Sequence, residues 1–130
     1  MTALHAAALY AGLNLVLLVG LAANVTRHRM MLKIAVGGGG NPLMERIVRV
    51  HGNAAEYVPG MIAAWLALAL VGAPALLVHG LGIVFTAGRV LHAVGFTQRA
   101  MVNVGRGLGM MLTWGCLLIA AGGCIYYALT

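Results

Sequence analysis

The residues best suited to chemistry are gathered between Glu45 and Pro59, where polar side chains run directly into an apolar segment. This stretch contains both carboxylates of the chain, together with an Asn, a His and a Tyr. Residues three or four apart share one face of a helix, so several of these side chains form a single polar stripe. The stripe consists of Arg46, Arg49, Asn53 and Glu56. A charged side chain costs about 2.5–3.5 kcal/mol at the centre of a bilayer, so we expect the charged side chains of the stripe to have a structural or functional role.

A second polar stripe has the same kind of spacing and consists of Arg89, His92, Phe96, Arg99 and Asn103. Two antiparallel helices joined by a tight turn would bring the stripes together, within one subunit or across a subunit contact. In one interpretation Glu56 neutralises Arg89 or Arg49, and the remaining cations reach the headgroups. However, the chain has eight Lys and Arg residues and only two acidic residues. This surplus favours a site for a small anion whose carboxylates Arg can hold bidentately, or for anionic lipid headgroups.

The composition identifies the class of protein that holds these stripes. Of the 130 residues, 62% are hydrophobic and 8% are charged, whereas soluble domains carry about 25% charged residues. This excludes an ordinary soluble domain, and the high hydrophobicity excludes a disordered chain. The net charge of +6 does not indicate nucleic-acid binding, because the cations lie mostly towards the ends of apolar segments, where membrane topology places them. We therefore predict an integral membrane protein.

Apolar segments of about 20 residues can span a bilayer, and the chain has four, at about residues 4–26, 42–71, 75–99 and 107–129. The predicted fold class is all-α, an integral membrane four-helix bundle in a single domain over residues 1–130. Asn41 and Pro42 supply the cap and the first residue of the second helix. Pro59 is expected to bend that helix or to loosen one turn.

The connections differ in charge, and this difference predicts the orientation. All eight Lys and Arg residues fall in or near the connections after the first and third helices. The positive-inside rule then places these connections in the cytoplasm and both termini on the other side. The basic run Arg27–Arg29 follows the first apolar core, whereas a signal peptide carries its charges before the core, so we expect a retained anchor. Gly37–Gly40 is interpreted as a flexible linker in preference to an anion-binding nest.

No metal or hydrolytic site competes with the two stripes. The five His residues are scattered, and no two lie at zinc-binding spacing with a third ligand. Cys116 and Cys124 would lie about 12 Å apart along one helix, too far for a disulfide, and are interpreted as packing residues. The glycine-rich run Gly105–Gly109 has no preceding strand, so it is interpreted as a flexible entry to the fourth helix and not as a dinucleotide loop.

The stretch from Arg49 to Pro59 resembles the signature of the MAPEG family, the membrane-associated proteins in eicosanoid and glutathione metabolism. In that family an Arg, an Asn, a Glu and a Pro recur on the second helix at the spacing of Arg49, Asn53, Glu56 and Pro59. The stretch Gly88–Phe96 resembles the third helix of prostaglandin-synthesising members. The four spans, the long first connection and the polar third connection also match. The chain looks like a bacterial-type, microsomal glutathione transferase-like member, which implies a bacterial inner membrane.

This resemblance implies a homotrimer that binds glutathione, as a co-substrate, between neighbouring subunits on the cytoplasmic side and within the membrane. In the family an Arg at the start of the fourth helix meets the thiol. Here that residue is Arg106, reached by allowing one extra residue after Phe96. Tyr57 matches the family's aromatic residue next to the second-helix Glu. The implied glutathione-binding residues are Arg49, Asn53, Glu56, Tyr57, Arg89 and His92.

The implied chemistry agrees with these residue types. Glutathione offers two carboxylates to Arg and one ammonium to Glu56. Its thiol has a pKa of about 8.5 and reacts as the thiolate, so the Arg106 guanidinium would raise the reactive fraction, and apolar surroundings strengthen that pairing. The second substrate is then a lipophilic electrophile arriving from the bilayer. The implied activity is that of a glutathione transferase or of a glutathione-dependent peroxidase or isomerase.

One position departs from the family pattern. Leukotriene-making members carry aromatic hydroxyls on the third helix, where this chain has His92 and Phe96. Phe96 cannot donate a hydrogen bond to sulfur or carboxylate, and two interpretations of His92 stay open: a substitute donor or a packed residue of the helix interior. Two other functions stay open: a non-catalytic membrane protein whose arginines bind anionic lipid or a small anion, and a small transporter, for which only Pro59 suggests a broken helix.

Overall fold

The computed structural model describes residues 1–97 and 104–130, without the side chains of residues 96 and 97. The described chain is helical apart from its connections: α1 (Ala3–Leu32), α2 (Pro42–Leu70), α3 (Ala75–Thr97) and α4 (Val104–Leu129). All four helices are long and apolar enough to cross a membrane. The all-α fold and the four candidate spans predicted from the sequence are therefore confirmed.

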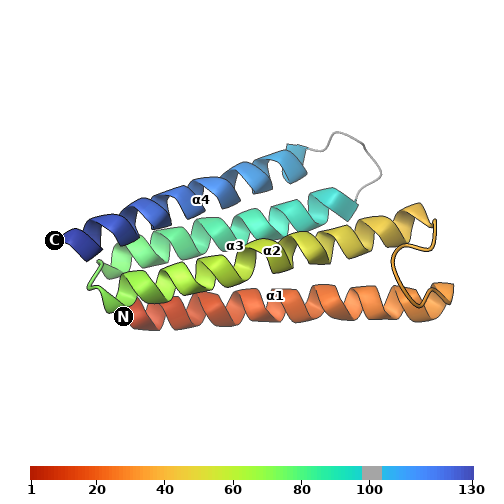
Figure 1. Ribbon diagram of the computed structural model, residues 1–130, viewed down its shortest axis with the longest axis horizontal. Helices are drawn as coiled ribbons and strands as arrows, with labels where there is room; N and C mark the ends of the chain where they lie inside the picture. Colours follow the sequence, from red (N-terminus) through yellow and green to blue (C-terminus); the bar gives the residue numbers. More distant parts are fainter. Residues whose placement is uncertain (98–103) are drawn as a thin grey trace.

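The helices lie side by side along the long axis of the molecule (Figure 1). Both termini lie at one end, and the connection between α1 and α2 lies at the other end. Helices α2 and α3 contact each other, and each also contacts both α1 and α4. Within the described residues α1 and α4 do not contact each other. The two helices that carry the polar stripes are therefore the central pair of the bundle.

The start of α2 follows the predicted capping arrangement. The Asn41 side chain accepts hydrogen bonds from the backbone N–H groups of Leu43 at 3.0 Å and Met44 at 3.2 Å, and Pro42 is the first helical residue. This satisfies two donors that would otherwise be unpaired at the helix start. Helix α2 continues through Pro59 as one element as far as Leu70.

Helix α1 is longer than its apolar segment, which ends near residue 26. The helix continues through the basic run and ends at Leu32. Lys33 then adopts a left-handed conformation with φ of 54°, and its N–H donates to the Arg29 carbonyl. The connection between the first and second helices is thus shorter at its start than the predicted spans indicate. Charged residues end a membrane span, but Arg and Lys are good helix formers, so they do not end the helix.

The apolar core is centred on Trp65 of α2, which is fully buried. Its ring lies 5.9 Å from the Tyr10 ring of α1 and 5.5 Å from the Phe85 ring of α3, measured between centroids. Large apolar side chains on the outer faces of the helices, such as Val16, Leu70 and Leu118, are exposed. Exposure of so many apolar side chains suits a chain surrounded by lipid.

Candidate functional site

The two polar stripes meet at Arg89 of α3, which is 1% exposed. Its Nη2 donates a hydrogen bond of 2.7 Å to Oδ1 of Asn53 on α2. Asn53 is also buried, with 5% of its surface exposed. A charged donor to a buried amide oxygen makes one of the stronger kinds of hydrogen bond. This contact fixes the middle of the second-helix stripe against the third helix.

Arg89 also reaches α4. Its Nη1 donates to Oγ1 of Thr113 at 3.4 Å, and the Thr113 hydroxyl in turn donates to the Gly109 carbonyl at 2.8 Å. The Thr113 hydroxyl proton is therefore in a hydrogen bond within α4, and its oxygen can accept a hydrogen bond from the Arg89 guanidinium. Nδ1 of His92 lies 3.5 Å from Nη2 of Arg89. A single buried guanidinium thus connects the three helices that carry the predicted site residues.

Arg49 and Glu56 lie on the outer side of α2 and form a salt bridge of 3.1 Å. Their side chains are 59% and 50% exposed. Of the two acid–base pairings that the sequence left open, the one with Arg49 is found. The predicted stripe is therefore divided, because Asn53 faces the bundle interior while Arg49 and Glu56 face outwards. An exposed pair of this kind contributes about 0–1 kcal/mol, so each partner can exchange the other for a ligand group at little cost.

Arg106 lies in the first turn of α4 and is exposed. Electrostatic interactions connect His92 with Arg89, Arg106 and Arg49. Arg89 interacts in the same way with Tyr57 and Glu56. The structure therefore links the predicted binding residues and the predicted catalytic Arg106 into one electrostatic cluster, in the half of the bundle away from the termini. The cluster consists of Arg49, Asn53, Glu56, Tyr57, Arg89, His92 and Arg106.

Tyr57 is held from two sides. The Arg89 Cζ atom lies 5.8 Å from the centroid of its ring, within the range of a cation–π contact. Its hydroxyl oxygen accepts a hydrogen bond of 3.1 Å from Nε1 of Trp114 on α4. Neither Thr113 nor Trp114 was predicted to belong to the site. A Thr and a Trp in an apolar helix carry no signal of their own, because both occur there as packing or interfacial residues.

Three residues of the second stripe fall where the structure gives no side-chain description. Phe96 belongs to α3 by its backbone alone, and Arg99 and Asn103 lie outside the described residues. The predicted stripe on α3 is therefore observed at Arg89 and His92.

A separate polar cluster joins α1 to α3 in the other half of the bundle. The side-chain amide of the fully buried Asn14 donates to the Tyr10 carbonyl at 2.9 Å and to Oγ1 of Thr86 at 2.8 Å. The Tyr10 hydroxyl lies 2.9 Å from Nδ1 of His79. These contacts pair polar groups that would otherwise meet hydrocarbon, and they place no surplus charge in this half.

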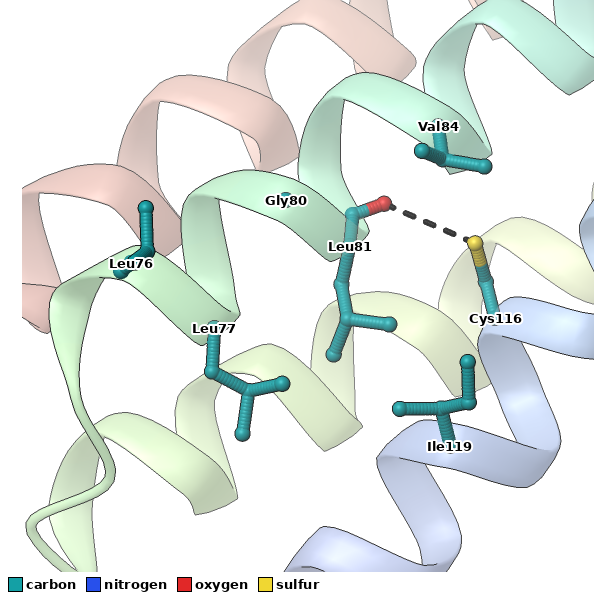
Figure 2. A pocket seen from close by; sticks show the side chains of 7 residues that line it. All are labelled: Leu76, Leu77, Gly80, Leu81, Val84, Cys116 and Ile119. Atoms are coloured by element: carbon teal, nitrogen blue, oxygen red, sulfur yellow. Dashed lines mark hydrogen bonds between the residues drawn. The ribbon is translucent and has the colours of Figure 1, made fainter.

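An apolar groove of about 280 Å³ lies between the first half of α3 and the middle of α4 (Figure 2). Its lining residues are Leu76, Leu77, Gly80, Leu81, Val84, Cys116 and Ile119. The Cys116 thiol points across the groove towards the Leu81 carbonyl, at 3.8 Å. Both Cys116 and Cys124 are free thiols. This lining offers hydrocarbon contact and no charged group, so the groove lacks the chemistry of the arginine cluster.

Comparison with known proteins identifies the family of this chain. The sequence profile of the MAPEG family matches residues 7–126. The inner membrane protein YecN of Escherichia coli K12 is 39% identical over 120 residues, which cover 92% of this chain and 90% of YecN. The YecN protein of Escherichia coli O6:H1 shows the same identity over the same shares. A family match over nearly the whole chain, together with a relative of this similarity, shows that the protein is a member of the MAPEG family.

Proposed function

We propose that the protein is a membrane-bound glutathione transferase that binds glutathione between the subunits of a homotrimer and directs its thiol at lipophilic electrophiles. The single observation that carries the proposal is the charge pattern of the arginine cluster. Arg49 forms an ion pair with Glu56, the charge of Arg89 interacts with that of Glu56, and the charges of Arg49, Arg89 and Arg106 all act on His92, so three arginines accompany a single carboxylate. Such a cluster has one position for an ammonium group and an excess of positions for anions. Glutathione carries one ammonium, two carboxylates and an ionisable thiol.

The outward-facing pair supports a role in binding. Arg49 and Glu56 lie 3.1 Å apart and are half exposed, so they present opposite charges side by side. A zwitterionic ligand can replace the internal pair with two pairs of its own: carboxylate on Arg49 and ammonium on Glu56. Asn53 accepts a hydrogen bond from Arg89 inside the bundle, so its role in this proposal is to hold that guanidinium behind the outward-facing pair. The exposed face of α2 is then the surface that a neighbouring subunit would close.

Arg106 is the residue that we propose acts on the thiol. It is exposed in the first turn of α4, and its charge reaches His92. A guanidinium beside the sulfur stabilises the thiolate, and the released proton passes to water. The thiolate sulfur then forms a bond to the electrophilic carbon of the second substrate, whose leaving group departs with the electron pair. Because the cluster lies on candidate membrane-spanning helices, such a substrate can arrive through the bilayer.

The proposal is tested by thermal unfolding and by conjugation in detergent. Millimolar glutathione should raise the unfolding midpoint of the wild type, and Arg49→Gln should remove most of that shift. Arg106→Gln should retain the shift but lose at least tenfold in conjugation of glutathione to 1-chloro-2,4-dinitrobenzene. Arg27→Gln, at an exposed position of α1, is the matched loss of one positive charge. An unchanged midpoint for the wild type, or an equal loss in Arg27→Gln, would contradict the proposal.

A second candidate function is the binding of anionic lipid or a small anion without catalysis. The observation that favours it is an open hollow of about 360 Å³ at the start of α2, lined by Pro42, Glu45, Arg46 and Arg49. Within the described residues the buried Nε of Arg46 has no hydrogen-bond partner. This candidate predicts co-purified anionic lipid that Arg46→Gln and Arg49→Gln both release, with no conjugation of any electrophile. Conjugation that depends on Arg106 would exclude it as the main function.

A further inference from the structure

The contact between Trp114 and Tyr57 determines where the Tyr57 proton can point. Nε1 of Trp114 lies 3.1 Å from the Tyr57 hydroxyl oxygen. An indole N–H can only donate, so the phenol oxygen is the acceptor in this bond. The phenol has one proton, which must then be directed away from Trp114. Within residues 1–97 and 104–130 this bond is the one that the hydroxyl makes, so its O–H remains available to donate.

The ring that carries this hydroxyl is held by a different helix. The Arg89 guanidinium lies 5.8 Å from the Tyr57 ring centroid, and Arg89 is itself held by Asn53 at 2.7 Å. Tyr57 is thus held by α3 at its ring and by α4 at its hydroxyl. Two separate supports leave the side chain little rotational freedom. Such a donor is preorganised and does not need to be ordered when a ligand binds.

The other phenols of the chain are committed elsewhere. Of the four Tyr residues, Tyr10 is bonded to His79 in the opposite half of the bundle. Tyr126 and Tyr127 lie against each other near the end of α4. Tyr57 is therefore the phenol of the arginine cluster, and it follows Glu56 directly in the chain.

We propose that Trp114 is a positioning residue that directs the Tyr57 O–H at an anionic group of bound glutathione, a carboxylate or the thiolate. The proposal rests on the proposed function for the identity of the ligand. Trp114 itself touches no reacting atom and acts through the oxygen of Tyr57. It is suited to this role because it is half exposed, at 49%. Its replacement therefore removes the hydrogen bond without opening a cavity in the core.

The hydrogen bond is tested by the NMR signals of the two Trp indole groups in ¹⁵N-labelled protein. Trp114→Phe identifies the Trp114 signal by its loss. In the Tyr57→Phe variant the Trp114 signal should shift upfield in the proton dimension, because the indole N–H loses its acceptor. The signal of Trp65, which is fully buried, should stay in place and serves as the internal control. A Trp114 signal that does not move in Tyr57→Phe would overturn the proposal, whether or not glutathione binds.

The proposed contact between Tyr57 and glutathione is tested by titration calorimetry. Glutathione is titrated into four proteins: the wild type, Trp114→Phe, Tyr57→Phe and the double variant. Loss of a hydrogen bond to a charged group predicts a roughly tenfold weaker affinity for Tyr57→Phe, and loss of orientation alone predicts about fivefold for Trp114→Phe. The double variant should match Tyr57→Phe. Leu118→Ala, at an exposed apolar position of α4, controls for changes on the lipid-facing side and should bind as the wild type does.

The outcomes of this cycle are distinguishable. A Trp114→Phe loss that persists in full in the Tyr57→Phe background would mean that Trp114 does not act through Tyr57, and the positioning role would be wrong. An unchanged affinity in Trp114→Phe would have the same meaning. A wild type that binds no glutathione would contradict the proposed function instead, and the NMR shift would then decide the Trp114–Tyr57 contact separately.

Discussion

Arg89 illustrates how a buried charge is retained inside this bundle. It is 1% exposed, and its hydrogen-bond partners within the described residues are the Asn53 amide, the Thr113 hydroxyl and the His92 ring. Removing one acceptor from a buried guanidinium exposes its desolvation cost. We expect Asn53→Ala to lower the free energy of unfolding by about 2 kcal/mol. Denaturant or thermal unfolding in detergent micelles measures this loss.

Arg49→Gln is the matched variant for that measurement, because it breaks an exposed ion pair of the same helix. Its stability should fall by less than about 1 kcal/mol, while glutathione binding is lost. The two variants therefore separate stability from binding. If Asn53→Ala and Arg49→Gln were equally stable, Asn53 would not be the acceptor that holds Arg89.

At this scale the sequence predicts the members of the cluster better than their partners. The spacing of Arg49, Asn53 and Glu56 was sufficient to place them on one helix, and Glu56 had two possible arginines. Spacing along a helix carries no information on how far that helix is rotated against its neighbours. This rotation decides that Asn53 points to Arg89 while Arg49 and Glu56 point outwards. The support from Trp114 has no signature in the sequence for the same reason.

Among the elements, α3 and α4 approach each other closely at Gly109. A Cβ atom added there would lie 2.5 Å from the Gly88 carbonyl oxygen and 2.6 Å from the His92 backbone nitrogen. These neighbours are backbone atoms and cannot move aside, so the helices would have to separate. We expect Gly109→Ala to destabilise the protein by about 1–3 kcal/mol, measured by thermal unfolding. Gly115→Ala on the same helix, where a Cβ has no neighbour within 4 Å, should be neutral or slightly stabilising.

The outcome at Gly109 also concerns the site, since Thr113 donates to the Gly109 carbonyl and accepts from Arg89. A separation of α3 and α4 should therefore weaken glutathione binding as well. Equal unfolding midpoints for Gly109→Ala and Gly115→Ala would show that the two helices are not packed this closely.

Helices α1 and α3 are joined by the buried amide of Asn14, which donates to Oγ1 of Thr86. Hydrogen bonds between membrane helices contribute about 0.6 kcal/mol on average and up to about 2 kcal/mol. We expect Asn14→Leu to lower the stability by about 1 kcal/mol. In a double-mutant cycle, Thr86→Val should cost less in the Asn14→Leu background than in the wild type. Additive losses would mean that the two side chains do not interact.

The elements themselves were largely predictable, because apolar length and polar flanks determine where helices cross a bilayer. Asn41 and Pro42 gave the start of α2, and the bonds to Leu43 and Met44 confirm it. The end of α1 at Leu32 was not predictable in this way. Hydropathy detects where the chain leaves hydrocarbon, whereas the helix ends only where Lys33 takes a left-handed conformation.

The whole molecule is electrically asymmetric along its axis. Arg27, Arg29, Lys33 and Arg46 lie towards the end with the α1–α2 connection, and both termini lie at the opposite end. The positive-inside rule predicts a cytoplasmic α1–α2 connection. A C-terminal alkaline phosphatase fusion should then be active in a bacterial host, and a C-terminal green fluorescent protein fusion should be dark. Fusions made after Gly38 should give the opposite result, and the reverse pattern in both places would contradict this orientation.

The assembly and the ligand are best tested together, because the proposed site is complete only between subunits. Arg49 and Glu56 are half exposed in the isolated subunit, although they belong to the central helix pair and lie beside the buried Arg89. Native mass spectrometry from detergent should therefore give a trimer that takes up one glutathione per subunit, with no glutathione on any monomer released. Arg49→Gln should leave the trimer intact and remove the ligand. A ligand-free trimer carrying lipid would favour the anionic-lipid function, whereas a monomer that binds glutathione would show that α2 needs no neighbour to complete the site.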